Sequence, residues 1–306
     1  MKPLFMALSS PDISLCIVSN KVKGLLSDCL NSIYRQTAKY TFEVILVDNK
    51  SDDGTVEMIR SDFPLVRLIQ APSDMGYTWP MNQALKQAQG RYCVQLNPDT
   101  VVIDQAFDRL VDFMESHPEV GICTPKVLNR DGTLQKQCRR SAARPWDVLT
   151  YFSGLYRLFP KNHLFGGYLQ TFIGEDEIHA VEAVSGSCMF MRRDMIEQVG
   201  YLDERFFAYQ EDADYCFRAR QAGWQIYYVP LAKIIHYGGQ GGSRVHPYRS
   251  IYQWHLSYYR YYRKNLAIDY FFLLNWLFYG LMAAKLGLGL VAAFISKDKY
   301  VGSRKP

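Results

Sequence analysis

The chain has 306 residues, and 48% of them are hydrophobic, which is enough to bury a full core and argues against wholesale disorder. The length predicts one large domain, or a catalytic domain with an appendage. The net charge of +5 is concentrated at one end: residues 253–306 carry eight Lys/Arg and two acids, while the other 252 residues carry 27 basic and 28 acidic groups. This distribution excludes a nucleic-acid-binding body, and a basic, aromatic tail is typical of a membrane surface.

The seven cysteines are odd in number and form no CxxC pair, which argues against a disulfide framework or a structural zinc site. We expect reduced thiols in the core of a cytosolic protein. Residues 1–12 lack a basic region followed by an apolar run, so no secretory signal is predicted.

The first half of the chain alternates strands with helices. Short apolar runs predict strands at Ile13–Val18, Phe42–Val47, Leu65–Gln70 and Tyr92–Leu96. Helical periodicity predicts helices at 24–37, Val56–Ser61, Asn82–Ala88 and 104–116. This order predicts an α/β fold with a largely parallel, doubly wound sheet, in which ligands bind beyond the carboxyl ends of the strands.

The second half is less regular. Residues 139–180 are expected to be rich in loops and aromatic side chains. Beyond them, the pattern predicts a strand pair or a glycine-kinked strand at Val181–Met191, a helix at Asp212–Ala222, and strands at Trp224–Val229 and Lys233–His236.

Polar residues follow the predicted strands where a ligand would bind: Ser19-Asn20, Asp48-Asn49 and Asn97-Pro98-Asp99. The Asp48 carboxylate can accept hydrogen bonds from a base or ribose, or simply cap a loop. Pro98 fixes the chain direction beside Asp99, whose carboxylate suits a Mg²⁺ or Mn²⁺ ion that bridges two phosphates. A turn without ligand is the structural alternative.

Three acids stand together in Glu211-Asp212-Ala213-Asp214, at the start of a predicted helix. Acids in a first turn suit the helix dipole, which is the structural explanation. The apolar Phe206–Tyr209 segment beside them predicts partial burial, which raises a carboxylate's pKa and suits general-base work. We assign the chemistry to Asp212 and a structural role to Asp214, which is placed for a surface pair with Arg218.

His236 ends an apolar strand and precedes a glycine-rich run, Tyr237–Gly242. A histidine in this place is commonly just a partly buried side chain. The glycines allow the backbone to approach a phosphate, or allow a loop to move. The run is not a GxGxxG at a strand–helix junction, so dinucleotide binding is not supported.

Seven stretches in order resemble the family 2 inverting glycosyltransferases, and within them the rhamnosyltransferase-like branch. They are VDNKSDDGT (47–55), GYTWPMNQAL (76–85), GRYCVQLNPD (90–99), DGTLQKQCRR (131–140), VSGSCMFMRRD (184–194), FFAYQEDADYCFRARQAGW (206–224) and YVPLAKIIHYGG (228–239). The resemblance covers roughly residues 12–245 and implies the GT-A fold, with a mostly parallel central sheet.

The resemblance also implies roles on the donor side. Asp48 would contact the nucleotide base or ribose, with Ser19 beside it, and Asp74 and Asn82 would flank the donor pocket. Departures occur here: Asn20-Lys21 stands where the family usually has Tyr-Asn, Asp74 where it has Asn, and Trp79-Pro80 where it has small residues. These departures bear on the donor's base and sugar.

On the reacting side, the resemblance implies that Asp99 and His236 bind a divalent cation, Mg²⁺ or Mn²⁺, with Asn97 beside it. Asp212 would be the general base, next to the substrate-binding Glu211.

The tail is expected to associate with a membrane, so we divide the chain into a catalytic domain at 1–245 and a C-terminal region at 246–306, with membrane contact through 248–296. Tyr270–Ser296 is long enough to span a bilayer. Lys285 near its middle costs about 2.5–3.5 kcal/mol on insertion scales and favours a helix or helical hairpin in the interface instead. An oligomerisation helix or ordinary core is the alternative.

The sequence therefore predicts transfer of a sugar from a nucleoside-diphosphate donor to a glycan or polyprenyl-diphosphate-linked acceptor in cell-surface polysaccharide synthesis. We expect dTDP-rhamnose first and UDP-hexoses second, at the cytoplasmic face of the cell membrane. A catalytically dead nucleotide-sugar-binding protein would lack the metal or base residues, which are present. A nucleotidyltransferase would need a glycine-rich phosphate loop, but Ser19–Leu25 contains only Gly24.

Overall fold

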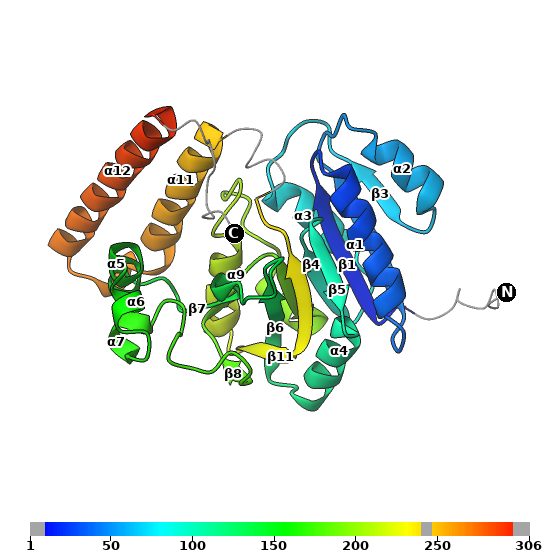
Figure 1. Cartoon of the computed structure of the whole chain (residues 1–306), viewed down its shortest axis with the longest axis horizontal. Helices are drawn as coiled ribbons and strands as arrows, with labels where there is room; N and C mark the ends of the chain where they lie inside the picture. The colour runs from blue at the N-terminus through cyan, green and yellow to red at the C-terminus, as the bar shows by residue number, and fades with distance from the viewer. Residues whose placement is uncertain (1–9, 240–246, 296–306) are drawn as a thin grey trace.

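The computed structural model describes residues 10–239 and 247–295. Within them, one nine-stranded sheet forms the centre of the molecule (Figure 1). Its strands lie in the order β3 (Arg67–Gln70), β2 (Phe42–Asp48), β1 (Ile13–Ser19), β4 (Tyr92–Leu96), β10 (Cys188–Arg192), β6 (Val120–Leu128), β11 (Gln225–His236) and β5 (Thr100–Ile103), with β8 (His179–Ala180) paired to β11.

The first four strands of that order, β3-β2-β1-β4, are all parallel. β10 runs antiparallel to β4 and β6, β6 and β11 are parallel, and β5 runs antiparallel to β11. The predicted α/β class with a mostly parallel sheet is confirmed. Its parallel half places the carboxyl ends of β1, β2 and β4 at one edge.

Six helices pack around the sheet: α1 (Lys23–Gln36), α2 (Thr55–Asp62), α3 (Thr78–Gln87), α4 (Ala106–Ser116), α8 (Arg193–Val199) and α9 (Glu211–Gln221). α1 shows why they form. Its Leu26, Leu30 and Ile33 recur at helical spacing and are fully buried, while the opposite face is solvated. The main core consists of such faces and the two sides of the sheet.

Several predicted elements need correction. Strands β5 and β6 were not expected, and β6 carries Pro125, which breaks the usual strand pattern. The two predicted strands after Gly223 are one strand, β11, whose pairing with β6 shifts register between Val229 and Lys233. Helix α3 starts at Thr78 instead of Asn82, because Pro80 is tolerated in a first helical turn.

The segment 181–191 contains two strands, β9 (Ala183–Val184) and β10, but they do not pair with each other. β10 lies in the central sheet, and β9 pairs β7 (Arg139–Arg140) in a second small sheet. The preceding region is more regular than expected. After a 3₁₀ turn at Lys136–Cys138 it contains three short helices, α5 (Pro145–Ser153), α6 (Leu155–Leu158) and α7 (His163–Gly166). Pro145 begins α5 and Gly154 ends it at φ 80°, the usual asymmetry of helix ends.

All seven cysteines are free and buried, as expected for reduced core thiols. Their burial leaves no native thiol at the surface.

The tail forms two helices, α11 (Pro247–Asn265) and α12 (Phe272–Ile295), joined through a 3₁₀ turn at Ala267–Asp269 and packed side by side (Figure 1). α11 is an integral part of the body, because Tyr258, Tyr261 and Tyr262 are buried in a second hydrophobic core. The assignment of membrane contact to the whole of 248–296 is therefore wrong for the buried face of α11.

Asp214 explains much of this docking. It is fully buried and accepts hydrogen bonds from Arg218 (3.0 Å), Lys264 (2.7 Å) and Asn265 (2.8 Å). Its structural role is confirmed, but the pair with Arg218 is buried at the α9–α11 contact and is not a surface pair.

α12 differs from α11: it has 24 residues, a mean hydropathy of 1.8 in its most apolar window, and only 11% of that window is buried. By length and composition it is able to cross a membrane. Lys285 lies 3.2 Å from His255 and over the rings of Phe152 (4.1 Å) and Trp254 (4.2 Å). The charge that argued against a membrane-spanning helix is thus turned toward the protein.

We predict that Tyr261→Phe lowers the free energy of unfolding by about 1–2 kcal/mol, because the buried Ala142 carbonyl loses the hydroxyl that donates to it at 2.7 Å. Urea denaturation of the full chain measures this. Tyr252→Phe, at an exposed position of the same helix, is the control and should leave stability unchanged. Equal stability of both variants would contradict an integral α11.

Candidate active site

Ser19 and Asp48 lie directly opposite each other at the ends of the parallel strands β1 and β2. Both are buried, and neither Ser19 Oγ nor Asp48 Oδ1 has a hydrogen-bond partner. The other Asp48 oxygen accepts the Ser51 N–H at 3.2 Å. Buried polar atoms without partners are uncommon, so these two are available for a ligand's hydroxyl or N–H groups.

The loop after β3 is held against this edge by Asn49. Its amide donates to Asp74 Oδ1 (3.1 Å) and to the Gly76 carbonyl (2.8 Å) and accepts from the Met75 N–H (2.9 Å). Asp74 also pairs with Arg249 of α11 at 2.7 Å. Asp74 is therefore connected to the Asp48-Asn49 turn, and α11 reaches back to the same loop.

Asn82 is not part of this group of contacts. It is buried, its amide donates to the Leu202 carbonyl and the Glu204 carboxylate, both at 2.9 Å, and its oxygen accepts the Leu202 N–H at 3.0 Å. All its hydrogen-bonding capacity goes to the protein itself. The geometry favours a structural role, and we leave Asn82 out of the proposed donor site.

Asp99 and His236 meet beyond the ends of β4 and β11. His236 Nε2 lies 3.2 Å from Asp99 Oδ1 and 3.1 Å from the Asn97 amide, and the Tyr237 N–H donates to the Asp99 carbonyl. Burial acts to raise the pKa of Asp99, but the hydrogen bond and charge of His236 outweigh it, so that pKa lies below its ordinary value.

Gln135 fixes the histidine ring. Its Oε1 lies 2.9 Å from His236 Nδ1, and its amide donates to the His236 carbonyl at 2.9 Å. Gln135 thus occupies the Nδ1 side of the ring, and Nε2 faces the Asp99 carboxylate and the Asn97 amide.

The site fits a divalent ion whose remaining ligands come from a substrate. Within residues 10–239 and 247–295, no group of three or more His, Cys, Asp or Glu side chains is placed to hold an ion alone. Two protein ligands plus phosphate oxygens and water are a common arrangement for Mg²⁺ and Mn²⁺ with nucleotides. Asp99 and the oriented His236 have the required chemistry.

Asp212 lies at the start of α9, where its carboxylate is fixed on several sides. Its Oδ2 accepts from Arg140 (2.8 Å) and from the Gly186 N–H (2.9 Å). Burial opposes the charge on Arg140, but the Asp212 carboxylate and the Tyr168 hydroxyl outweigh it and raise the pKa of Arg140. A Cβ at Gly186 would lie 2.5 Å from the Gln95 amide, so the buried Gln95 side chain would have to shift to accept another residue here.

Glu211 is buried beside Asp212, and its Oε2 has no partner. Burial and the neighbouring Asp212 charge raise the pKa of Glu211 to about 8. The Tyr77 hydroxyl donates to Asn97 at 3.3 Å, and burial together with the charges of Glu211 and Asp212 raises the pKa of this phenol. Tyr77 therefore connects the Asn97 turn with the acidic helix start.

The backbone that delivers these acids is strained. Tyr209 and Gln210 adopt φ values of 67° and 62°, in the left-handed region that few non-glycine residues occupy. Such residues cost about 1–3 kcal/mol each and cluster at functional sites.

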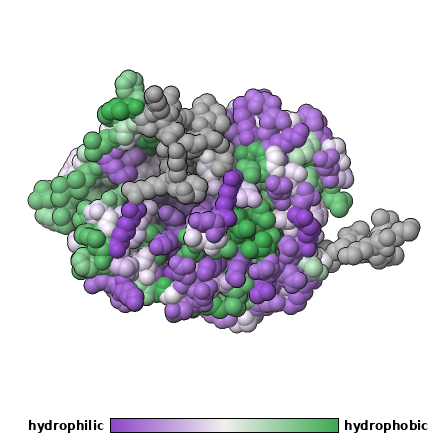
Figure 2. Space-filling model, in the orientation of Figure 1, coloured by the Kyte–Doolittle hydropathy of each residue, from purple (hydrophilic) through white to green (hydrophobic). Residues whose placement is uncertain are grey.

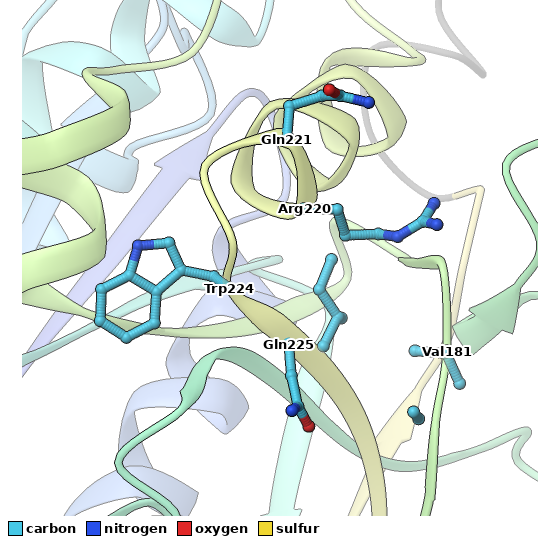
Figure 3. A pocket seen from close by; sticks show the side chains of 7 residues that line it. Val181, Arg220, Gln221, Trp224 and Gln225 are labelled. Atoms are coloured by element: carbon cyan, nitrogen blue, oxygen red, sulfur yellow. The ribbon is translucent and has the colours of Figure 1, made fainter.

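Two surface hollows lie near these elements. One of about 270 Å³ lies at the far end of α9, lined by Arg220, Trp224 and Val181 among others, away from the acids of its first turn (Figure 3). The other, of about 410 Å³, is lined by Leu25, Asp28, Arg130, Ile235 and Tyr237. Because successive side chains of a strand point to opposite faces, Ile235 lies on the other face of β11 from His236, and neither hollow is lined by the candidate site residues.

Sequence reasoning missed the supporting residues of this site. Arg140, Gln135, Tyr77 and Gln95 received no role. The family resemblance gave a signal for three of them, because the stretch 131–140 contains Gln135 and Arg140 and the stretch 76–85 contains Tyr77. Their partners lie far away in the chain, so the sequence did not show what they contact.

Solved proteins with this arrangement of sheet and helices are glycosyltransferases of the GT-A class. The mannosyltransferase PcManGT from Pyrobaculum calidifontis, in complex with GDP-Man and Mn²⁺, has a TM-score of 0.57 at 17% identity, covering 99% of this chain and 80% of its own. GalNAc-T7 with UDP, GalNAc and Mn²⁺ has a TM-score of 0.55 at 16% identity, covering 74% and 43%. The implied GT-A fold is confirmed.

The chain belongs to glycosyltransferase family 2, since the profile described as "Glycosyltransferase like family 2" matches residues 11–245. It is 29% identical to the N-acetylglucosaminyl-diphospho-decaprenol L-rhamnosyltransferase of Mycobacterium tuberculosis, over 66% of this chain and 68% of that one. It is 24% identical to the low-salt glycan biosynthesis hexosyltransferase Agl10 of Haloferax volcanii, over 74% and 67%. The protein is a glycosyltransferase with rhamnosyltransferase-like relatives.

We predict a pH-dependent contribution of Glu211 to stability. The pKa of Glu211 is higher in the folded chain than in the unfolded chain, so protonated Glu211 favours the folded state. This contribution to stability is complete below pH 4.5 and is lost as the pH rises through about 8. Glu211→Gln mimics the protonated form, so its Tm relative to wild type should increase between pH 5 and pH 8. Glu197→Gln, at an exposed site, is the control, and parallel pH profiles for Glu211→Gln and wild type would refute the prediction.

Proposed function

We propose that this glycosyltransferase is inverting and metal-dependent, and transfers rhamnose from dTDP-rhamnose to a hydroxyl of a glycan or polyprenyl-diphosphate-linked acceptor in cell-surface polysaccharide synthesis. The observation that carries the proposal is the gathering of three features at the carboxyl edge of the sheet. These are the unpartnered Ser19–Asp48 acceptors, the Asp99–His236 pair and the fixed Asp212 carboxylate.

The donor's nucleoside would occupy the β1–β2 end. Ser19 Oγ and Asp48 Oδ1 have free capacity for the base and ribose, and the loop carrying Asp74 closes one side of that space. Asn97, beside His236, would contact the diphosphate or sugar. The reacting carbon would then lie between the nucleoside end and the start of α9.

Asp99 and His236 would hold a divalent ion, which supplies neutralisation of the charge that develops on the leaving diphosphate. Both solved relatives named above were determined with Mn²⁺ and a nucleotide or nucleotide sugar, which supports this choice.

Asp212 would take the proton from the acceptor hydroxyl, while Arg140 and the Gly186 N–H keep its carboxylate in one orientation. The hydroxyl attacks the anomeric carbon from the face opposite the diphosphate, the bond from that carbon to the diphosphate oxygen breaks, and the configuration inverts. One displacement needs no covalent intermediate, and so no second catalytic carboxylate. Glu211 would lie against the bound substrate.

The exposed apolar α12 supports attachment at the cytoplasmic face of the cell membrane, and the name of the mycobacterial relative includes a decaprenol-linked acceptor. A membrane-bound enzyme would meet such an acceptor at the lipid surface.

We predict that dTDP-rhamnose with Mn²⁺ raises the Tm. At a hundredfold excess of ligand over Kd, binding adds about 2.7 kcal/mol to the free energy of unfolding. EDTA should abolish the shift, as should Asp99→Asn, because the diphosphate then lacks its cation. A thermal-shift panel of nucleoside-diphosphate sugars measures this. An equal shift in EDTA would refute metal dependence, and a shift with UDP-hexoses alone would change the donor.

We further predict that Asp212→Asn loses turnover by at least about 10²-fold, because the amide cannot take the proton. The donor-induced thermal shift should be retained, while the Tm of the unliganded protein falls because Arg140 loses its counter-charge. Product release from a labelled donor, in the presence of a lipid-linked acceptor, measures turnover. Asp62→Asn, at an exposed position in α2, is the control. Undiminished turnover in Asp212→Asn would remove it from the mechanism.

A further inference from the structure

A second apolar surface lies outside the tail, on the three short helices α5–α7. We call residues 145–166 the helical platform. It exposes six large apolar side chains, each between 44% and 72% accessible: Trp146, Leu149, Phe152, Leu158, Phe159 and Leu164. Apolar side chains gathered in this way on a surface indicate contact with a partner or a membrane.

The platform is continuous with α12. Phe152 of α5 lies 4.1 Å from the Lys285 ammonium of α12 and 6.0 Å, edge to face, from Trp254 of α11. Figure 1 shows α5, α6 and α7 below α11 and α12 on the same side of the molecule, and Figure 2 shows apolar surface along that side. The two apolar surfaces therefore adjoin through Phe152.

The charge of the helical platform and of α12 indicates which kind of surface they contact. From Val148 to Gly174 the sequence contains no acid, while Arg157 and Lys161 are basic, and from Tyr270 to Ile295 it again contains no acid. Asp147, the one carboxylate of the platform, is turned inward and accepts from Ser141 at 2.7 Å. An apolar, acid-free, basic surface is complementary to anionic lipid headgroups and acyl chains.

The platform is also tied to the reacting side of the site. The Tyr168 carbonyl, two residues beyond it, accepts the Ser141 N–H at 2.9 Å, and the Tyr168 hydroxyl bonds Arg140. Arg140 in turn donates to Asp212. A lipid surface touching the platform would thus lie on the side of the molecule where the base receives its acceptor.

We propose that the helical platform is a second membrane-contacting element, which together with α12 seats the enzyme on an anionic phospholipid bilayer with Asp212 toward the lipid-borne acceptor. Only this last orientation rests on the proposed function; lipid contact by the platform stands on its own surface. Trp146 and Phe159 enter the headgroup region, while Arg157 and Lys161 meet the phosphates.

A site-specific probe separates the platform from α12. Because the seven native cysteines are buried, Leu158→Cys can be labelled with an environment-sensitive fluorophore, and Leu65→Cys, equally exposed but on the opposite side of the fold, is the matched control. On adding phosphatidylglycerol-rich vesicles, the probe at 158 should shift to the blue and brighten, and the probe at 65 should not. An unchanged signal at 158 while the protein co-floats with vesicles would overturn the proposal.

A charge-introducing variant tests the energetic contribution. The triple change Leu149→Glu, Leu158→Glu and Leu164→Glu should weaken vesicle binding of the full chain by about tenfold or more, because three apolar side chains no longer enter the lipid. The control, Leu65→Glu with Leu231→Glu, alters equally exposed leucines elsewhere and should bind as wild type. Turnover with a water-soluble acceptor analogue should be the same in all three proteins.

The outcomes are distinguishable. Undiminished vesicle binding by the triple variant would overturn the proposed lipid contact of the helical platform. If the wild type were a dimer and the triple variant lost the dimer but kept vesicle binding, the platform would contact a second copy of the chain and the proposal would again be overturned. If the wild type transferred no sugar, but bound vesicles and the triple variant did not, the proposed function would fail while the lipid contact of the helical platform would stand.

Discussion

The buried pair between Arg140 and Asp212 is the interaction on which the rest of this site depends. It joins β7 to the first turn of α9, which lie 72 residues apart, and the Gly186 N–H completes the shell around the same carboxylate oxygen. Further hydrogen bonds make a buried ion pair tolerable, and Arg140 also donates to the Val184 carbonyl, while its Nε has no hydrogen-bond partner among the residues that the structure describes. The strained turn at Tyr209 and Gln210 directly precedes the acids of α9.

The residues of the proposed donor side are brought together by the pairing of parallel strands. Parallel pairing brings the ends of β1, β2 and β4 to one edge, so that Ser19, Asp48 and Asn97 share it regardless of their distance in sequence. β4 and β6 run in the same direction, because both pair antiparallel with β10, and β11 is parallel to β6. The carboxyl end of β11 therefore brings His236 to Asp99 at the same edge, and Gln135 fixes the ring. Unpartnered acceptors on one side and a cation-ready pair on the other suit a ligand with a nucleoside at one end and phosphates at the other.

The C-terminal region combines two different kinds of surface. α11 buries tyrosines whose hydroxyls donate to the carbonyls of Ala142 and Ala143, two and three residues after Arg140 in the chain, so it braces the segment that carries Arg140. α12 rests on α11 and turns Lys285 inward onto aromatic rings, which leaves its outer face apolar. α12 is therefore joined to the catalytic domain through packed side chains of α11.

The sequence alone determined the features that arise from local chemistry. β1, β2 and β4 are short apolar runs, each followed by a polar turn, and α9 begins with acids that suit its dipole, so Asp48, Asp99 and Asp212 could be selected as candidates, as could the GT-A fold through the order of their motifs. The tertiary structure decided everything that depends on long-range contacts. The Asn82 side chain is hydrogen-bonded to Leu202, 120 residues away, and Arg140 donates to Asp212. The buried face of α11 belongs to the core, because the Tyr258 hydroxyl donates to the Ala143 carbonyl, 115 residues away in the chain. No local pattern records which distant group satisfies a buried polar atom, and for that reason the structural role of Asn82 and the supporting role of Arg140 became visible only in the folded chain.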